Sequence, residues 1–256
     1  MIWFFSKGIS AFYKFLHKDN YFLNMIKAIL MDFNGVIIND EPIQHRAYRE
    51  VFANFGIDVT DEMYYSRMGM DDKTFIHSIM DEAGQNVDDE TVRGITESKT
   101  AHWRNIVAAS IPLFDGVDGF IKKMARKFEL GIVSMAKREE IDFILDTTGL
   151  GDYFSVVISA EEIKDCKPDP ECYRKGFQEI DLCRVAKGHL PMIHSDCLVI
   201  EDSPQGVMSA RAADLPVLAV SNTVEEKELR AAGAFSVTDR LSEWMPESII
   251  RVFDLN

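Results

Sequence analysis

Short apolar segments and amphipathic helical segments alternate along the second half of the chain, and this alternation restricts the fold more than any other feature. The apolar runs of strand length are residues 130–134, 154–159, 197–200 and 217–220. The helical patterns lie at residues 117–126, 137–147, 170–180 and 205–213. Strands and helices that alternate at this length are typical of an α/β fold. We therefore predict a doubly wound parallel sheet that forms a Rossmann-like core.

A further apolar run precedes this region at residues 27–31 and ends in an acid, Asp32. Gly35 follows and allows the backbone to turn sharply. Because ligands bind at the carboxyl ends of strands in open parallel sheets, Asp32 stands where chemistry is usually done. From these residues alone, the alternative is an acid that closes a strand and faces solvent.

The segment between this first strand and Leu130 shows helical patterns and lacks strand-like runs. The patterns span residues 44–55, 71–83 and 88–107. An all-helical block between two sheet strands indicates an insertion that forms a second, small domain. We therefore divide the chain into a core of residues 27–41 and 114–256 and an inserted all-helical domain of residues 42–113.

Two segments lie outside this pattern. Residues 1–26 form an N-terminal extension, in which four apolar residues from Phe5 to Leu16 have helical spacing. A docking or membrane-surface helix and a mis-assigned start, with translation beginning at Met25, remain open for this extension. Residues 183–195 contain Gly188 and Pro191, and we expect them to form a loop.

Composition limits the partners and the location of the protein. The chain has 256 residues, of which 46% are hydrophobic, and its net charge of −14 argues against nucleic acid or an anionic membrane surface as the main partner. Its four cysteines show no metal-finger spacing and no CxxC pair, which favours a reduced, cytoplasmic protein. No apolar run approaches the length of a bilayer span, so we expect no integral membrane segment. We also expect a monomer or a weak dimer.

Two further polar residues follow strand ends or precede helices. Ser134 ends the run at residues 130–134 where the next helix begins, and the free amides and dipole of a helix start favour an anion. Lys167 precedes a turn made rigid by Pro168 and Pro170, which restricts the direction of its ammonium group. The alternatives are an ordinary N-cap serine and a solvated surface lysine.

The strand-like run at residues 197–200 ends in two adjacent acids, Glu201 and Asp202. Two such carboxylates repel each other unless a cation lies between them and Asp32. Oxygen ligands of this type suit Mg²⁺, which often uses one or two carboxylates together with a substrate phosphate. A solvated acid at the start of a helix is the alternative.

Taken together, these four strand ends predict phosphoryl transfer. Asp32 attacks phosphorus, and Ser134 and Lys167 hold the non-bridging oxygens. Mg²⁺ bound by the acidic pair offsets the repulsion between nucleophile and substrate.

The chain resembles the haloacid dehalogenase superfamily, specifically its helical-cap phosphatases and β-phosphoglucomutase-like members. The resemblance covers residues 27–234 and rests on Asp32-Phe33-Asn34-Gly35-Val36, Ser134, Lys167-Pro168-Asp169-Pro170 and Glu201-Asp202-Ser203. It implies that Asp32 is the phosphorylated nucleophile and a Mg²⁺ ligand. It also implies that Asn34 binds Mg²⁺ through its backbone carbonyl and that Asp202 completes the protein ligands, with Glu201 close by.

Two residues depart from the family pattern. The family's phosphatases carry a second aspartate where this chain has Asn34, and that side chain protonates the leaving oxygen and then activates water. A carboxamide does neither, and general acid–base catalysis is typically worth about 10²–10⁴ in rate. Turnover is therefore expected to be slow, and Asn34→Asp is expected to raise it at least tenfold. The second departure is Gln44, where sugar-phosphate members often have histidine, which weakens a mutase interpretation.

The origin of Asn34 stays open at this point, because it is compatible with a natural residue, an engineered change or a site of Asn-Gly deamidation. The segment 66–71 resembles the cap loop that faces the core, so Arg67 is a candidate contact for a second anionic group, as is Lys73. Glu41 is a further candidate substrate contact. Solvated surface charges are the alternative for Arg67 and Lys73.

The sequence as a whole predicts a Mg²⁺-dependent phosphatase that acts on a small phosphorylated metabolite through an aspartyl phosphate. The predicted catalytic residues are Asp32, Asn34, Ser134 and Lys167. A phosphate-binding scaffold or sensor that has lost turnover is the main alternative, and a phosphosugar mutase is another.

Overall fold

The computed structural model describes residues 26–253 and centres on a six-stranded sheet. The strands are β1 (Ala28–Met31), β2 (Glu129–Val133), β3 (Val156–Ile158), β4 (Cys197–Glu201), β5 (Val217–Val220) and β6 (Ser236–Thr238). They follow the order β3-β2-β1-β4-β5-β6, and every neighbouring pair is parallel. This order confirms the doubly wound sheet and places its switch point between β1 and β4, where ligands of such folds bind.

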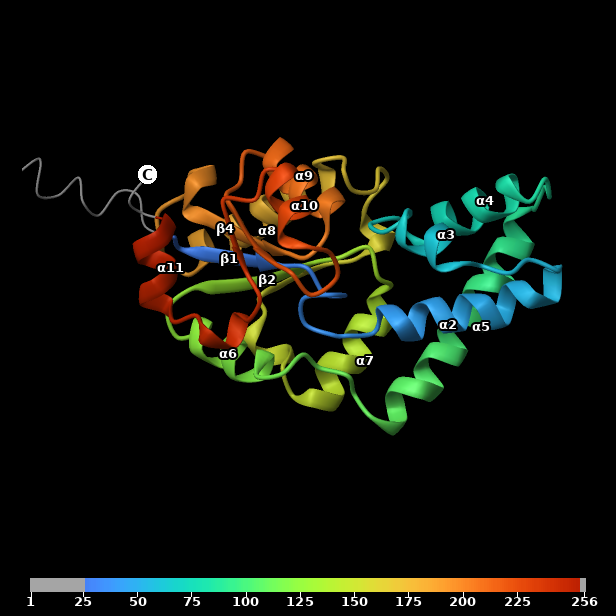
Figure 1. Cartoon of the computed structure of the whole chain (residues 1–256). Coiled ribbons are helices and arrows are strands. Elements are labelled where there is room, and N and C mark those ends of the chain that lie inside the picture. The colour runs from blue at the N-terminus through green and yellow to red at the C-terminus, as the bar shows by residue number, and fades with distance from the viewer. Residues whose placement is uncertain (1–25, 254–256) are drawn as a thin grey trace, which may run out of the picture.

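Helices cover both faces of the sheet (Figure 1). One face carries α6 (Val117–Met124), α7 (Arg138–Thr148) and α11 (Pro246–Phe253), and the other carries α8 (Glu171–Ala186), α9 (Pro204–Ala212) and α10 (Glu226–Ala231). Strand β1 shows why two layers form. Ile29 and Met31 belong to the apolar cluster on one side, whereas Leu30 belongs to the cluster on the other, because successive side chains of a strand point to opposite faces.

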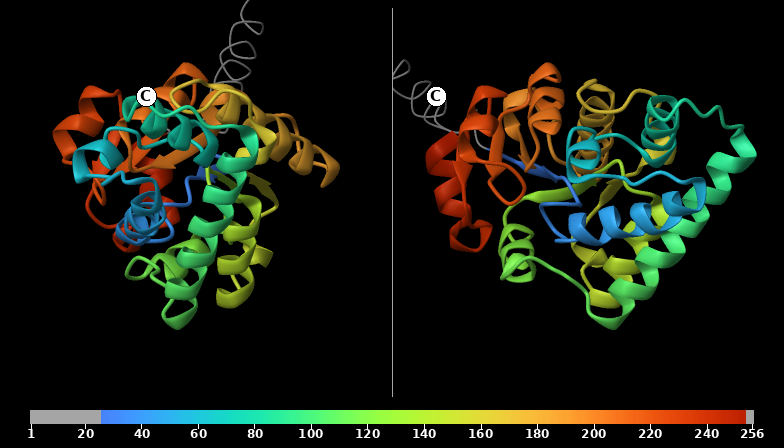
Figure 2. Two further views of the ribbon diagram at one scale, coloured as in Figure 1. Left: turned by 90° about the vertical axis from the view of Figure 1, so that its right-hand side faces the viewer. Right: turned by 45° about the vertical axis from the view of Figure 1, so that its right-hand side comes forward.

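The segment between β1 and β2 begins with four helices, α2 (Glu41–Phe52), α3 (Asp61–Tyr65), α4 (Asp72–Glu82) and α5 (Asp89–Ala109). Asp71 and Asp88 start α4 and α5, since their carboxylates accept hydrogen bonds from backbone amides of the first turn. These helices share an apolar cluster of their own, which includes Phe52 and Ile76. Figure 2 shows them gathered beyond one end of the sheet, so the predicted all-helical cap is present. Its exact bounds at residues 42 and 113 stay a prediction.

Short 3₁₀ helices occupy connections at Ala53–Phe55, Gly151–Tyr153, Ala160–Glu162, His194–Asp196 and Leu241–Glu243. The predicted loop at residues 183–195 is wrong at its start, because α8 continues to Ala186 before Gly188 adopts a positive φ of 86°. The apolar residues of that extra turn, Leu182 and Val185, are exposed, so they do not continue the buried apolar stripe that marks a helix.

Four elements escaped prediction from the sequence, namely α3, α10, α11 and β6. Strand β6 has only three residues at the sheet edge, all half-buried, and α3 spans five residues. Such short elements carry too few apolar positions to show a period. The N-terminal extension lies outside the described residues, apart from Ile26. Within the described part of the chain, no helix has the length and apolar character needed to cross a membrane.

Candidate active site

A pocket lies between the carboxyl ends of the strands and the helical cap. The core contributes Asp32 after β1, Ser134 after β2 and Asp202 after β4, and the loop before α8 contributes Lys167. The four residues predicted from separate strand ends and loops therefore meet around one cavity. That cavity measures about 90 Å³, below the roughly 300–1,000 Å³ of typical ligand pockets. Residues of both the core and the cap line it.

Asp32 is held at the floor of this pocket by two donors. Its Oδ1 accepts a hydrogen bond of 2.7 Å from the amide of Phe33, and its Oδ2 lies 3.1 Å from Lys167 Nζ. Burial raises the pKa of Asp32 to about 7, although the neighbouring lysine opposes this rise. The carboxylate is thus oriented, poorly solvated and in need of positive charge.

Glu201 positions Lys167. Its Oε1 lies 2.6 Å from Lys167 Nζ and accepts a 2.9 Å hydrogen bond from the Tyr173 hydroxyl. Its Oε2 accepts hydrogen bonds from the amides of Asp202 and Ser203 and from the Ser203 hydroxyl. Burial alone would lower the pKa of Lys167, but the charges of Asp32 and Glu201 outweigh burial and raise it. The lysine therefore stays a fixed cation.

The three acids form the group suited to a metal ion. Ligand oxygens of Asp32, Glu201 and Asp202 all lie within 4.8 Å of one another. Asp202 is 1% exposed, and burial, followed by the charges of Glu201 and Asp32, raises its pKa well above the ordinary value. Three buried carboxylates and one lysine leave an excess of negative charge, which a divalent cation would balance. Each Glu201 oxygen already accepts from at least two donors, whereas each Asp32 oxygen has one. Asp32 and Asp202 are therefore better placed than Glu201 to bind a cation.

Gly35 makes room for Asp202. A Cβ atom at this position would lie 1.8 Å from Asp202 Oδ2, and the φ angle of 73° is one that side chains other than glycine rarely adopt. Thr223 donates its hydroxyl to the same oxygen. The turn after β1 therefore needs a glycine at position 35 to leave space for the Asp202 side chain.

Asn34 and Ser134 face each other across the pocket. The Ser134 hydroxyl lies 3.4 Å from Asn34 Oδ1 and accepts a 3.0 Å hydrogen bond from the amide of Ala136. The Asn34 side-chain nitrogen points the other way, to Asp40, at 2.9 and 3.1 Å from its two oxygens. Asp40 was not among the residues selected from the sequence.

The cap residues selected from the sequence behave differently. Arg67 lines the pocket, but its guanidinium nitrogens bond to the Ser78 hydroxyl, the Met63 carbonyl and Glu82, all within the cap. Lys73 is exposed, does not line the pocket and pairs with Asp89 at 3.1 Å. Glu41 lines the pocket and accepts a 2.6 Å hydrogen bond from the Tyr64 hydroxyl.

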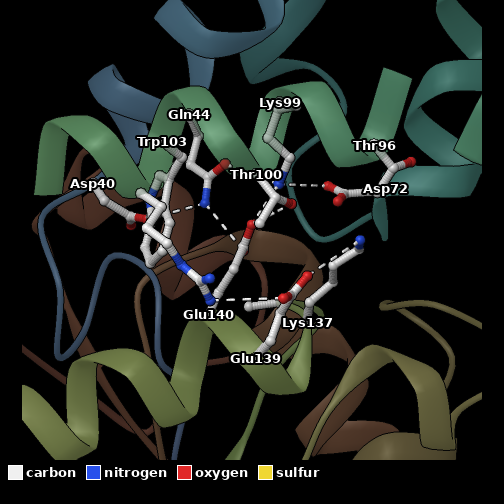
Figure 3. A network of polar contacts seen from close by, with 12 residues as sticks. Asp40, Gln44, Asp72, Thr96, Lys99, Thr100, Trp103, Lys137, Glu139 and Glu140 are labelled. Atoms are coloured by element: carbon white, nitrogen blue, oxygen red, sulfur yellow. Dashed lines mark hydrogen bonds and ion pairs between the residues drawn. The ribbon is translucent and has the colours of Figure 1, made fainter. Parts of the chain in front are cut away.

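A buried polar network joins the cap to the core beside the pocket (Figure 3). Lys99 of α5 is 2% exposed and lies 3.0 Å from both Glu140 of α7 and Asp72 of α4. Gln44 accepts a 3.1 Å hydrogen bond from the same ammonium group. One sequence signal could have revealed Lys99, which shares a helix face with Ile95 and Trp103 at four-residue spacing and interrupts an apolar stripe.

A doubly wound sheet with this site under an inserted helical cap defines a class of α/β hydrolytic enzymes, and comparison with known proteins specifies the family. A family model described as haloacid dehalogenase-like hydrolase matches residues 29–220. The chain therefore belongs to the haloacid dehalogenase-like hydrolases. The resemblance inferred from the sequence is confirmed.

Individual relatives are distant. The phosphorylated carbohydrates phosphatase of Thermotoga maritima is 23% identical over 231 residues, which cover 89% of this chain and 98% of that protein. Protein SUPPRESSOR OF QUENCHING 1 of Arabidopsis thaliana is 28% identical over 221 residues, 84% of this chain but only 20% of that protein. A β-phosphoglucomutase structure from Clostridium difficile superposes with a TM-score of 0.77 at 19% identity, covering 90% of this chain and 98% of that one. The last similarity concerns the fold.

Proposed function

We propose that the protein is a Mg²⁺-dependent phosphatase of small phosphorylated metabolites. The observation that carries this proposal is the convergence of Asp32, Lys167, Ser134 and Asp202 on one pocket under the cap. A nucleophile, a fixed cation, a hydroxyl donor and a metal-binding acid together serve phosphoryl transfer and few other reactions. Membership of a hydrolase family agrees with it.

Asp32 would attack the phosphorus atom with its free lone pairs, forming an aspartyl phosphate and releasing the alcohol oxygen of the substrate. Lys167, fixed by Glu201 at 2.6 Å, would bind a non-bridging oxygen. The Ser134 hydroxyl, directly after β2, would donate to another non-bridging oxygen. Asp32, Asp202 and the backbone carbonyl of Asn34 would hold Mg²⁺, which supplies charge neutralisation when bound.

Asn34 sets the expected rate. The leaving alkoxide needs a proton, and the hydrolysis of the aspartyl phosphate by water needs a base. A carboxamide supplies neither. The loss of general acid–base catalysis costs typically about 10²–10⁴ in rate, so we propose slow turnover, with good leaving groups least affected. A phosphate-binding sensor remains the second candidate, and Asn34 is the observation that favours it.

The pocket favours a substrate with one phosphate. Among the described residues that line it, the cations are Arg67, Lys99 and Lys167. Arg67 and Lys99 pair with acids away from the nucleophile, whereas Lys167 pairs with Asp32 itself and with Glu201. Asp72 also lines the pocket, and its Oδ2 is buried without a hydrogen-bond partner. A buried carboxylate oxygen of this kind suits a hydroxyl or ammonium donor, and it repels a second phosphate. We therefore propose monophosphates of polyols or sugars as the substrate class.

Phosphate release from a panel of phosphomonoesters tests this proposal. Sugar and polyol monophosphates, sugar bisphosphates and p-nitrophenyl phosphate are incubated with the protein in Mg²⁺ or in EDTA. The proposal predicts slow, Mg²⁺-dependent release that is faster for monophosphates than for bisphosphates. Saturable binding without release would favour the sensor, and release unaffected by EDTA would contradict the proposal.

A further inference from the structure

The position of the Asn34 side chain is imposed by Asp40, a residue of the turn that leads into α2. Asp40 is fully buried and sits six residues after Asn34. Its Oδ1 lies 2.9 Å from Asn34 Nδ2, and its Oδ2 accepts hydrogen bonds from Trp103 Nε1 at 2.6 Å and Gln44 Nε2 at 3.0 Å. Figure 3 shows Asp40, Gln44 and Trp103 converging at this point.

The direction of every hydrogen bond in this chain of contacts is fixed by groups that only donate. Lys99 has no acceptor, so Gln44 must turn its Oε1 toward the lysine and its Nε2 toward Asp40. The indole nitrogen of Trp103 also only donates. The Asp40 carboxylate thus accepts hydrogen bonds from Trp103 and Gln44. Because it is an acceptor, the Asn34 amide must turn its nitrogen toward it.

This arrangement settles which atom of Asn34 faces the pocket. With its nitrogen bound to Asp40, the amide presents Oδ1 toward Ser134, 3.4 Å away. An amide oxygen accepts a hydrogen bond and can orient a water or a hydroxyl, although it does not take up a proton at neutral pH. Glutamine residues of some phosphoryl-transfer enzymes orient water in this way.

We propose that Asp40 is a positioning residue that locks Asn34 with its carbonyl oxygen toward the reaction site, so that Asn34 orients the attacking water and does not serve as acid or base. The inference rests on the proposed phosphatase function. It also makes Asn34 and Asp40 a matched pair. If only position 34 is changed to aspartate, the hydrogen bond between the two residues is lost. A carboxylate at position 34 would lack the donor that Asp40 requires and would set two buried oxygens against each other.

The pair can be exchanged without loss of the hydrogen bond. In the double variant Asn34→Asp with Asp40→Asn, the new amide oxygen at position 40 accepts from Trp103 and Gln44. Its nitrogen donates to the new carboxylate at position 34. The double variant therefore restores the acid–base aspartate of the family in a setting that accommodates it. The Asn34→Asp variant alone does not.

The test compares the unmodified protein with N34D, D40N and the double variant N34D/D40N. Thermal unfolding midpoints are measured without substrate, and phosphate release is measured with p-nitrophenyl phosphate and Mg²⁺. Asn39→Asp serves as the matched control, because Asn39 is exposed and outside this pocket.

The sequence alone predicts that Asn34→Asp raises turnover at least tenfold, but the contact with Asp40 changes this expectation. We expect N34D to lower the midpoint by about 5 °C and to raise turnover less than about threefold, because it leaves a buried acceptor unsatisfied. The double variant should recover the midpoint and turn over at least about tenfold faster than the unmodified protein. D40N should keep most of the stability but let the Asn34 amide flip, so its turnover should fall about tenfold. A purely structural role of Asp40 would not separate stability from turnover in this way.

N34D with a midpoint and turnover equal to those of the double variant would overturn the inference. Unchanged turnover in D40N would overturn it too. If the midpoints are coupled as expected but no variant releases phosphate, the pairing stands and the proposed phosphatase function fails. The two failures are therefore distinguishable.

Discussion

Glu201 Oε1 lies 2.6 Å from Lys167 Nζ, and this contact gives the two acids after β4 different tasks. Glu201 spends both oxygens on hydrogen bonds to the lysine, a tyrosine and the following turn. Among the described residues, only Thr223 donates to the Asp202 carboxylate, at Oδ2, so we propose that Asp202 is the better metal ligand. The strand-end pattern alone did not distinguish the two acids, and the contacts of Glu201 now do.

The different contacts of Glu201 and Asp202 predict that substitutions at the two positions change different kinetic quantities. Glu201→Gln should lower kcat/KM for p-nitrophenyl phosphate by about 10- to 100-fold, because a charged hydrogen bond worth roughly 1.5–3 kcal/mol is lost. The Mg²⁺ concentration for half-maximal activity should stay within about threefold. Asp202→Asn should instead raise that Mg²⁺ concentration more than about tenfold. Phosphate release titrated with Mg²⁺ measures both quantities, and equal Mg²⁺ responses of the variants would contradict the assignment.

Gly206 leaves space for the Glu201 carboxylate. A Cβ atom on this residue would lie 1.7 Å from Glu201 Oε1, so Gly206→Ala should displace the carboxylate and cost more than about 2 kcal/mol in the free energy of unfolding. Gly94→Ala is the matched control, since Gly94 lies within α5 with open space around it. That control should gain roughly 0.5–1 kcal/mol from helix propensity. Urea unfolding measures both, and a Gly206→Ala variant as stable as the unmodified protein would contradict the packing.

Glu41 should make stability depend on pH. Burial, followed by the charge of Asp40, raises its pKa to about 7 in the folded protein, above the value near 4.5 of a free side chain. The folded state therefore holds a proton that the unfolded state has lost, and stability from this group declines as pH rises from about 4.5 to 7. Glu41→Gln removes the titration, because an amide does not ionise in this pH range. The amide oxygen of glutamine can still accept the Tyr64 hydrogen bond. The unfolding free energy of the variant relative to the unmodified protein should rise by about 3 kcal/mol from pH 4.5 to pH 8. A pH-independent difference would contradict this assignment.

Asp72 should determine which alcohol the pocket accepts. Asp72→Asn keeps the shape of the side chain but removes the negative charge that faces both the pocket and Lys99. We expect the preference for monophosphates over bisphosphates to fall about tenfold, measured as the ratio of kcat/KM values. Asp81→Asn, an exposed change on the same helix, is the control and should leave the ratio unchanged. An unchanged ratio in Asp72→Asn would contradict the proposed substrate class.

The sequence predicted β1 to β5 because each of these strands is mostly apolar and a polar residue follows it. Parallel strands bring their carboxyl ends to one edge, so Asp32, Ser134 and Asp202 were expected to meet, and they do. The hydrogen bond from Tyr173 to Glu201 could not be predicted, because Tyr173 reaches Glu201 from α8.

The cap–core network shows the same limit more strongly. Lys99, Asp72 and Glu140 come from three helices that are distant in the sequence. Only the packing of α5 against α7 and α4 reveals that they neutralise one another. Arg67 was expected to meet a substrate anion, but tertiary contacts with Ser78 and Glu82 hold its guanidinium within the cap. Asp40 was overlooked because no pattern in the sequence links it to Asn34.

The central claim is that Asp32 accepts a phosphoryl group, and mass spectrometry of the acid-quenched protein tests it most directly. The protein is mixed with p-nitrophenyl phosphate and Mg²⁺, quenched within the first turnover and digested with pepsin. The account predicts one added phosphoryl group on the peptide that contains Asp32, absent in Asp32→Asn and present in the exposed control Asp146→Asn. Phosphate release with an unmodified Asp32 peptide, or undiminished release by Asp32→Asn, would contradict it.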